Sequence, residues 1–329
     1  MSHLLFPILS ILSDGKFHSG EAMAKHFKVS RVAIWHAITE AENLGVEVFS
    51  VRGKGYRLTQ SLDLIDEEKI KQAIGEMANW FHLTVLDVVD STNNYLKKAA
   101  ATGHPHASCV VTHIQTHGKG RRGRQWQSAL GENLTFSFLW RFTKGASALS
   151  GLSLAVGIAL IRSLKKLHIH QALLKWPNDI LIYDDGAYKK LAGILIELQG
   201  DMDGQSAAII GIGINLNLSK KQTAKIDQPA TSINQFTDEP IDPNTILATI
   251  IRDLSEVMAA FEESGFAPLK DEWSSYDAFQ DKAINIILGD GNITQGRSNG
   301  VNDAGSLEVV TDDGVKVYAS GEVTIRKAE

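Results

Sequence analysis

Cysteine is almost absent from this sequence, and so are apolar runs long enough to cross a bilayer. The lone Cys109 cannot form a disulfide within the chain, which is typical of proteins in a reducing cytosol. A membrane-spanning helix needs about 20 consecutive apolar residues, so we expect no contact with a membrane. The N-terminal stretch "MSHLLFPILSILSDG" lacks the basic start and the small-residue cleavage site of a signal peptide. Together these absences predict a cytoplasmic protein.

Basic residues are also fewer than acidic ones in this sequence. The 329 residues include 33 Lys and Arg against 38 Asp and Glu, which gives a formal net charge of -5. Residues 1–60 nevertheless contain seven basic and five acidic side chains, a net of +2, and this leaves -7 for the remainder. A basic head on an acidic body indicates that the head binds a polyanion. The length is that of two or three domains.

Residues 1–60 have the pattern of helices followed by a basic hairpin. A first helix is expected over "PILSIL", a second begins at the N-cap residue Ser19, and a third is capped by Ser30 and closed by Gly45. A strand, a Gly-flanked basic turn and a return strand follow in "VEVFSVRGKGYRL". This order predicts a winged helix-turn-helix, whose third helix enters the major groove while the wing contacts phosphates. The DNA-binding candidates are Ser30, Arg31, Trp35, His36, Arg52 and Lys54.

A small helical protein-interaction domain is the alternative for this head, and the basic hairpin favours DNA. Arg31 is the one firm positive charge in the third helix. Affinity per protomer is therefore expected to be low, so tight DNA binding would need a dimer.

Residues 64–270 predict a mixed α+β body. A strand runs through "DSTN" into a helix, and "SCVVTHIQ" and "NLTFSFLWRF" read as strands. A long apolar helix is expected over "LSGLSLAVGIALIRSLKKLH". Three strand-like runs then precede a helix that begins at Asp242 and Pro243 and ends near Gly265. Strand runs outnumber helices and adjoin one another, which predicts a mixed sheet with its helices on one side.

The last residues alternate short β runs with turn signals at Gly289-Asp290-Gly291, Asp303-Ala304-Gly305 and Asp312-Asp313-Gly314. This spacing predicts a small antiparallel barrel. The expected domains are therefore a winged helix-turn-helix over 1–62, a mixed-sheet body over 63–275 and a C-terminal barrel over 276–329.

The stretch "HIQTHGKGRRGRQW", residues 113–126, concentrates cations and glycines in an otherwise acidic chain. Its "GKGRRG" matches the G-x-G-x-x-G string of dinucleotide-binding turns, but no helix follows that could hold a pyrophosphate. A Walker A string is absent as well, and a solvated surface loop is the plain alternative. Glycines between the cations favour a ligand site, because they let the backbone approach a ligand closely and let the segment move. Such a loop suits a substrate with several negative charges.

The basic loop and four further motifs together resemble the biotin–protein ligases. These motifs are "DSTN" (90–93), "KWPND" (175–179), "KLAGILIE" (190–197) and "GIGINLN" (211–217). With a winged head in front and a β barrel behind, the chain is similar to the bifunctional bacterial form, in which a biotin ligase is also the repressor of the biotin operon. The resemblance implies a catalytic domain of the biotin/lipoate ligase type and a C-terminal SH3-like barrel.

The resemblance also implies a two-step reaction. Biotin and ATP, with Mg²⁺, form biotinyl-5′-AMP and pyrophosphate, and the biotinyl group then passes to a lysine of a biotin carboxyl carrier protein. Cations that neutralise the carboxylate and the α-phosphate favour this meeting of two anions, and a closing loop protects the reactive product from water. Biotinyl-5′-AMP is further implied as the corepressor that promotes a homodimer on operator DNA.

Residue roles follow from the same resemblance. Lys190 and Arg121 are implied as catalytic residues, and no residue is assigned to a metal. The chain departs from the family at Lys119, where arginine is usual; lysine keeps the charge but loses the planar fork and its paired hydrogen bonds. The positions that match the biotin site are Ser91, Thr92, Asn93, Gln115, Lys119, Gly120, Arg121, Lys190, Gly193, Gly211 and Gly213. Those that match the nucleotide site are Arg121, Arg124, Trp126, Asn178 and Asn215.

Two other functions stay open. A lipoate-type acyl ligase shares this chemistry, although it would be expected to lack both the "GRRGR" loop and the winged head. A transcription factor that senses a small molecule without catalysis is the second, and intact Lys190 and Arg121 argue against it because a sensor needs no cationic in-line site. Within "KWPND", Trp176 and Pro177 are also compatible with simple packing.

Overall fold

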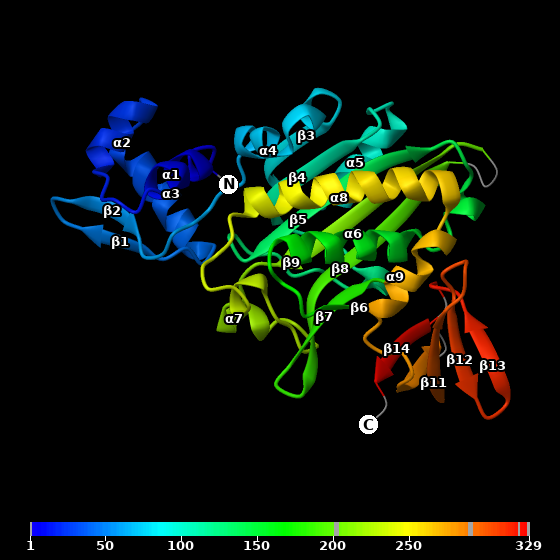
Figure 1. The fold of residues 1–329 in the computed structure, drawn as a ribbon. Helices are drawn as coiled ribbons and strands as arrows, with labels where there is room; N and C mark the ends of the chain where they lie inside the picture. The colour runs from blue at the N-terminus through cyan, green and yellow to red at the C-terminus, as the bar shows by residue number, and fades with distance from the viewer. Residues whose placement is uncertain (1, 201–203, 289–291, 322, 328–329) are drawn as a thin grey trace.

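The computed structural model describes residues 2–200, 204–288, 292–321 and 323–327, and these form three units in chain order (Figure 1). The N-terminal unit, blue in Figure 1, contains the helices α1 (Leu5–Leu12), α2 (Gly20–Phe27) and α3 (Arg31–Asn43). An antiparallel hairpin of β1 (Val48–Val51) and β2 (Gly55–Leu58) follows. This is the predicted winged helix-turn-helix.

Local sequence signals begin and end the third helix as expected. The Ser30 hydroxyl accepts a hydrogen bond from the backbone N–H of Ala33 at 3.1 Å, so it caps the first turn of α3. Gly45 has φ +94° just beyond the helix, and the N–H of Val46 bonds back to the Ala41 carbonyl at 3.0 Å. Glycine suits this left-handed position because it has no Cβ.

The central unit is built on a mixed sheet, which has the strand order β3-β4-β5-β9-β8-β7-β6 among the described residues. β3 and β4 are parallel, and the other neighbouring pairs are antiparallel. The strands are β3 (His82–Val89), β4 (Ser108–Gln115), β5 (Asn133–Phe142), β6 (Ala172–Lys175), β7 (Asp179–Asp184), β8 (Ala187–Gly200) and β9 (Ser206–Asn215).

The long helices α6 (Leu152–Lys166) and α8 (Pro243–Ser264) lie side by side across one face of this sheet (Figure 1). Both were expected from the sequence, whereas α4, which Asp66 caps, was not. The remaining helices are α4 (Glu67–Ile74), α5 (Thr92–Ala101), α7 (Lys220–Thr223) and α9 (Lys270–Ser275). The 3-10 turns are η1 (Gly75–Asn79), η2 (Arg121–Gly123), η3 (Ala146–Leu149), η4 (Ile233–Gln235) and η5 (Ala267–Leu269).

The sheet carries helices on both faces, so the predicted one-sided arrangement is wrong. Phe138 of β5 and Ile210 of β9 lie in the core with α6 and α8. The alternate residues Leu139 and Ile209 pack instead with Leu96 of α5. Both sets are buried, so these strands lack the polar alternation of a sheet that faces water on one side. The α5 face is also the face that carries the candidate site.

The C-terminal unit, orange to red in Figure 1, is an antiparallel sheet of order β13-β12-β11-β10-β14 among the described residues. The antiparallel pairing agrees with the prediction, and closure of this sheet into a small SH3-like barrel stays a prediction. The predicted turns at 303–305 and 312–314 separate its middle strands, whereas the predicted turn Gly289-Asp290-Gly291 lies outside the described residues. The strands are β10 (Ala283–Leu288), β11 (Ile293–Val301), β12 (Leu307–Thr311), β13 (Gly314–Tyr318) and β14 (Val323–Lys327).

Both terminal units pack against the central one. The core of the head continues into Ile114, at the end of β4, and into Leu130. The Phe6 ring of α1 stacks on the His113 ring with centroids 4.7 Å apart. Toward the C-terminus, the buried Trp176 donates its indole N–H to the carbonyl of Gly305 at 3.0 Å, which confirms its packing role. Across the described residues, no helix combines the length and apolar character that spanning a membrane requires.

Candidate functional site

A cavity of about 1090 Å³ opens on the α5 face of the central sheet. It is lined by the end of β4, the start of α5, the basic loop, the β6–β7 hairpin, parts of β8 and β9, and residues of β14. Every residue that the resemblance assigns to biotin or to the nucleotide lines this cavity. These residues are spread from position 91 to position 215, and the fold brings them together.

Polar side chains from α5, β4 and β5 form a hydrogen-bonded cluster at one end of the cavity. Gln115 Oε1 accepts hydrogen bonds from the backbone N–H and the hydroxyl of Thr92 at 2.8 and 3.1 Å. Ser137 Oγ lies 2.7 Å from Thr92 Oγ1 and 2.6 Å from Asn93 Oδ1. Ser91, which precedes α5, is also buried. Because a buried polar cluster holds donors and acceptors in set directions, it can recognise a small polar group.

Asn93 is fixed from the other side by β8. Its Nδ2 donates to Glu197 Oε2 at 3.0 Å. Burial raises the pKa of Glu197, but hydrogen bonds from Asn93 and Lys97 and the positive charges of Lys119 and Lys97 together outweigh that effect, so the pKa is lowered overall and the carboxylate stays ionised. A Cβ on Gly211 would lie 2.2 Å from Asn93 Oδ1. Glycine at 211 therefore leaves room for the chain's own Asn93, and its predicted place in the biotin site stays a prediction.

A second glycine makes room for the indole ring beside the cavity. A Cβ on Gly213 would lie 2.4 Å from Cε2 of Trp126. A Cβ on Gly193 would lie 3.1 Å from the Lys190 side chain and 3.4 Å from the Trp126 ring. Small residues on β8 and β9 thus let Trp126 and Lys190 lie close against the sheet.

A bulge in β8 turns Lys190 toward the cavity. β7 and β8 pair through Asp179↔Gly193 and Leu181↔Lys190, so two residues along β7 correspond to three along β8, and Leu191 is the extra one. Side chains alternate between the faces of a strand, and one extra residue reverses that alternation. Lys190 therefore shares a face with Gly193 and Asp179, and its Nζ lies 2.7 Å from Asp179 Oδ1.

Asn215 holds this bulge in place. Its Nδ2 donates to the carbonyls of Lys190 at 3.3 Å and Thr231 at 3.0 Å, and its Oδ1 accepts from Asn133 at 3.1 Å. The amide is thus used within the chain. This favours a positioning role for Asn215, and its predicted contact with the nucleotide stays a prediction.

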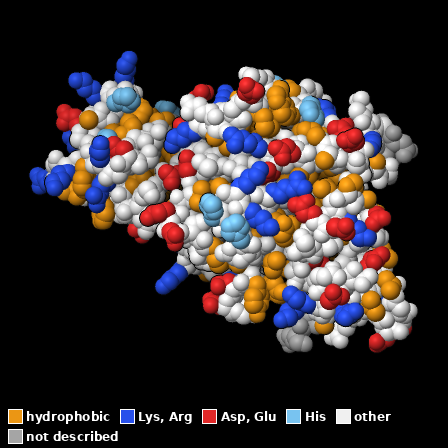
Figure 2. Space-filling view, in the orientation of Figure 1, with side chains coloured by type: hydrophobic (Ala, Val, Ile, Leu, Met, Phe, Trp, Pro, Cys, Tyr) orange, Lys and Arg blue, Asp and Glu red, His pale blue; other side chains and the backbone are white. Residues whose placement is uncertain are grey.

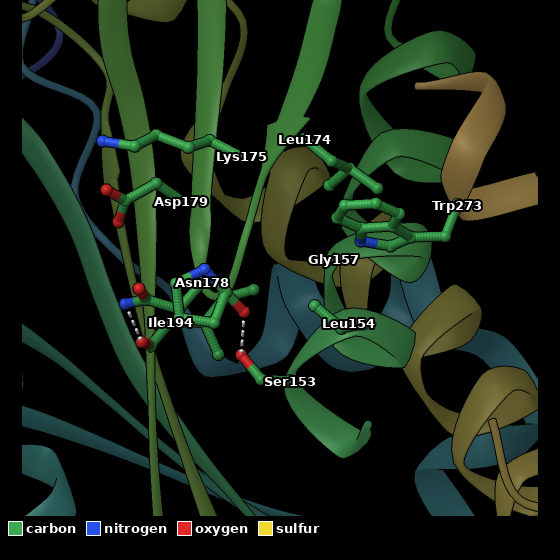
Figure 3. Close-up of a pocket in the computed structure, with 10 residues that line it drawn as sticks. Ser153, Leu154, Gly157, Leu174, Lys175, Asn178, Asp179, Ile194 and Trp273 are labelled. Atoms are coloured by element: carbon green, nitrogen blue, oxygen red, sulfur yellow. Dashed lines mark hydrogen bonds between the residues drawn. The ribbon is translucent and has the colours of Figure 1, made fainter. Parts of the chain in front are cut away.

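The β6–β7 hairpin adds another cation and a carboxylate. Lys175 and Asp179 pair directly across it and point to the same side, away from Leu174 and Trp273 (Figure 3). Asn178, at the turn, donates its side-chain N–H to the carbonyl of Ile194 at 2.8 Å. Burial lowers the pKa of Lys175, and the nearby Asp179 carboxylate opposes that effect. The hairpin therefore presents charge of both signs to the cavity.

The basic loop is a short hairpin of its own. The Gly120 N–H bonds to the Arg124 carbonyl at 2.7 Å, and the Trp126 N–H bonds to the Gly118 carbonyl at 2.9 Å. Arg122 forms the tip, with φ +56°, and a glycine follows it. The loop is thus held by its backbone, and its cationic side chains line the cavity.

Three cations of this loop reach other elements, and one of them, Arg122, donates to the carbonyl of Gly321 at 3.4 Å. Arg121 donates from Nη1 to Asn178 Oδ1 at 3.0 Å and from its second amino group to the carbonyl of Ser320 in the C-terminal unit. Lys119, where the resemblance predicts arginine, donates to Asn94 Oδ1 on α5. The loop therefore connects the β6–β7 hairpin, the C-terminal unit and α5 across the cavity.

Oxygen donors suited to magnesium are few in the cavity. The described residues contain no group of three or more His, Cys, Asp or Glu side chains that could hold a metal ion. Mg²⁺ commonly binds through one or two carboxylates and the phosphates of its substrate. The Asp179 carboxylate and the Asn178 amide oxygen line the cavity, and this donor set suits a Mg²⁺ that enters with ATP.

The DNA-binding candidates lie apart from the cavity, on the head. Figure 2 shows Lys and Arg side chains projecting from the outer end of this unit. Arg31, Trp35 and His36 are exposed on α3, and Arg52 and Lys54 are exposed around the β1–β2 turn. The sixth candidate differs, because the Ser30 hydroxyl is occupied as the cap of α3.

Sequence reasoning missed several residues that the fold places at or beside the cavity. Ser137 alternates with Phe136 and Phe138 in "TFSFLW", a pattern that could have revealed a polar position on a buried strand. Lys175 and Asp179 stand inside the "KWPND" motif but were given no role. Arg326 reaches the cavity from β14, and no sequence signal points to it.

Three family models match the chain. They are the biotin/lipoate A/B protein ligase family over residues 85–215, an HTH domain over 5–57 and the biotin protein ligase C-terminal domain over 281–326. Along the chain, the HTH match falls on the N-terminal unit, the ligase match on the central unit and the C-terminal domain match on the C-terminal unit.

Individual relatives match over nearly their whole length. The chain is 36% identical over 322 residues to the bifunctional ligase/repressor BirA of Salmonella typhimurium, covering 98% of this chain and 97% of the relative. It is 30% identical over 314 residues to BirA of Bacillus subtilis, covering 95% of each. The solved biotin protein ligase from Aquifex aeolicus in complex with biotin and ATP is 27% identical, with a TM-score of 0.63 over 75% of this chain and 99% of that chain. The chain therefore belongs to the biotin/lipoate A/B protein ligase family, within its group of bifunctional ligase/repressors.

Proposed function

We propose that this chain is an ATP-dependent biotin–protein ligase that also represses transcription of a biotin operon. The observation that carries the proposal is the cavity, in which a polar cluster, a cationic loop and the bulge residue Lys190 meet. The named relatives support it, because they are called ligase/repressors and biotin protein ligases.

The polar cluster favours biotin over lipoate. Biotin carries a ureido ring with N–H donors and a carbonyl acceptor, whereas the dithiolane ring of lipoate has neither. Thr92, Asn93, Gln115 and Ser137 provide buried donors and acceptors at one end of the cavity. A buried polar site that meets an apolar ligand leaves its groups unpaired, at about 1–3 kcal/mol for each group. The cavity should therefore select the ureido ring.

The first step joins two anions. A biotin carboxylate oxygen attacks the α-phosphorus of ATP, the bond to the bridging oxygen breaks, and pyrophosphate leaves with that electron pair. Lys190 is assigned to the carboxylate and the α-phosphate, and Arg121 to the phosphate. Both residues reach the cavity from separate elements, so they can neutralise the two reactants from two sides. Mg²⁺, when bound, would neutralise further phosphate charge.

The second step needs an acceptor lysine and no catalytic nucleophile from the ligase. The neutral ε-amine of a carrier-protein lysine attacks the acyl carbon, AMP leaves, and the proton of the new amide passes to solvent. The basic loop serves here by enclosing the mixed anhydride, because excluded water cannot hydrolyse it.

Repression is the second half of the proposal, and the winged head supports it. Arg31 on α3 with Arg52 and Lys54 on the wing provides few phosphate contacts for one protomer. Two heads of a homodimer on a palindromic operator would bind more tightly than one head. Biotinyl-5′-AMP is assigned as the ligand that favours this homodimer, which would link DNA binding to the supply of biotin. The chain would therefore have two partners. A biotin carboxyl carrier protein accepts the biotinyl group, and operator DNA binds the winged heads.

A pyrophosphate-exchange assay tests the ligase. Radiolabelled pyrophosphate should enter ATP when biotin and Mg²⁺ are both present, and lipoate or octanoate in place of biotin should give only background exchange. Exchange that is supported equally by octanoate would refute the biotin assignment. Absence of exchange with all three acids would refute the ligase itself.

A further inference from the structure

The outward face of α3 exposes two large apolar side chains, where a solvated helix would carry charge. Val32 is 60% exposed and Trp35 is 51% exposed. Val32, Trp35, His36 and Thr39 are spaced i, i+3, i+4 and i+7, so they lie on one face of the helix. The Trp35 ring contacts the His36 ring, with centroids 4.9 Å apart. We call these four residues the α3 stripe.

Charge around the stripe is complementary to a polyanion. Arg31 begins α3, and Arg52 and Lys54 stand exposed at the wing. The first acidic residue of the helix is Glu40, in its third turn. A stripe of apolar and uncharged polar side chains that is flanked by exposed cations suits the major groove, where phosphates border the apolar and polar edges of the bases. A purely apolar protein partner would leave these cations without a role.

We propose that Val32 and Trp35 contact thymine 5-methyl groups in the major groove and thereby select A·T pairs in each half of the operator. This inference rests on the proposed repressor function. The N-terminal residues of a recognition helix contact base edges, and Val32 and Trp35 lie in the first two turns of α3. Thymine alone presents a methyl group in the major groove, and apolar side chains contact that methyl group.

The composition of α3 supports contact with A·T pairs. Guanine is most often recognised by arginine or lysine, and Arg31 is the one residue of either type within α3. Val32 has no group that can hydrogen-bond to a base edge, and Trp35 offers only its indole N–H. Van der Waals contact with a thymine methyl group is the sequence-dependent interaction that both side chains can make.

Replacing thymine by uracil tests the proposal, because it deletes the methyl group and keeps every hydrogen bond. The full chain, with biotin and MgATP, first selects its preferred duplex from a random pool. Each thymine of that duplex is then replaced by uracil in turn, and Kd is measured at fixed salt. We expect A·T-rich positions in each half-site. At one or two of them, uracil should weaken binding about fourfold, the effect of losing one buried methyl-sized group.

Variants assign each methyl group to its side chain. In Trp35→Ala, the uracil penalty should disappear at one position and persist elsewhere, and Val32→Ala should do the same at another. Trp35→Phe should keep the penalty, because an aromatic ring still contacts the methyl group. Trp80→Ala is the matched control: Trp80 is 46% exposed and lies outside the head, so this variant should bind and discriminate as the wild type does.

Three outcomes overturn the inference. Equal affinity for thymine and uracil at every position removes the methyl contact and leaves the repressor function intact. A uracil penalty that persists unchanged in both alanine variants shows that other residues contact the methyl groups and that Val32 and Trp35 do not. If the full chain with biotin and MgATP selects no duplex at all, the repressor proposal fails and this inference fails with it.

Discussion

Lys190 illustrates how much of the chemistry depends on the setting of one residue. In a regular strand it would point to the face that packs on α6, where an ammonium group would be buried without a partner. The bulge at Leu191 directs it to the cavity face instead, and Asp179 pairs with it there. Asn215 fixes the carbonyl of the same residue. A cation held in place before substrate arrives needs little reorganisation during the reaction.

Lys190→Met should therefore remove most of the adenylation activity while keeping the length of the side chain. One preorganised charge at a reacting phosphate typically contributes about 10²–10³-fold in rate, and we expect a loss of that size in single-turnover formation of biotinyl-5′-AMP. The matched control is Lys189→Ala, since that neighbouring lysine pairs with Asp184 at the surface. A Lys190→Met rate within about threefold of wild type would contradict the catalytic assignment.

Two elements from different units, α1 and β4, meet directly behind the polar cluster. Phe6 of α1 stacks on His113 of β4, and Gln115, two residues further along β4, accepts the hydrogen bonds of Thr92. His113 is 8% exposed, and burial lowers its pKa to about 4. The contact between the head and the body is thus built around a histidine that stays neutral.

This contact should weaken in mild acid. An unfolded histidine has a pKa of about 6.5, so above that pH the His113 ring is neutral in both states. As the pH falls from about 6.5 toward 4, the unfolded chain binds a proton that the folded state excludes, and stability is lost within that window. At pH 5 we expect a loss of about 2 kcal/mol in the free energy of unfolding.

The measurement compares urea unfolding of wild type and His113→Phe at pH 7.5 and pH 5.0. The variant keeps a ring against Phe6 and removes the titrating group. The difference in free energy of unfolding between the two proteins should therefore shift by about 2 kcal/mol in favour of the variant when the pH falls from 7.5 to 5.0. Other titrating groups cancel in this comparison. A difference that does not change with pH would show that His113 takes up its proton in the folded state.

Across the whole molecule, the head and the catalytic body share a core. Ile114 and Leu130 of the body belong to the hydrophobic cluster of the head. The C-terminal unit likewise reaches the cavity, through Arg326 and through the Ser320 carbonyl that Arg121 contacts. Both terminal units are thus in contact with the elements that build the site.

Deleting residues 1–60 should have two effects. Operator binding should be lost, because the helix-turn-helix and the wing are removed. Biotin should also bind more weakly, since Ile114 and Leu130 become exposed next to Gln115. Titration of the truncated protein with biotin, alongside the full-length Phe6→Ala variant, separates these effects: Phe6→Ala should weaken biotin binding in the same direction but less. Unchanged biotin affinity in the truncated protein would mean that the head does not support the site.

Local patterns were sufficient to predict most of the longer elements of this chain, although not α4, and the motifs of its site. A cap such as Ser30 or a closing glycine such as Gly45 acts through hydrogen bonds within a few residues, so the head could be predicted as a winged helix-turn-helix. The ligands came from the resemblance of the body's motifs to those of the biotin–protein ligases. The residues matched to biotin and the nucleotide do line a common cavity, and their individual roles stay predictions.

Features that depend on contacts between distant residues could not be predicted in the same way. Strand periodicity does not say which face of the sheet α5 covers, because strands buried on both faces have no polar alternation. The bulge that turns Lys190 depends on how β8 pairs with β7. Arg326 reaches the cavity because the C-terminal sheet packs beside it, and Phe6 meets His113 because the head docks on β4. Each of these follows from pairing or packing between residues far apart in the chain, on which a local pattern carries no information.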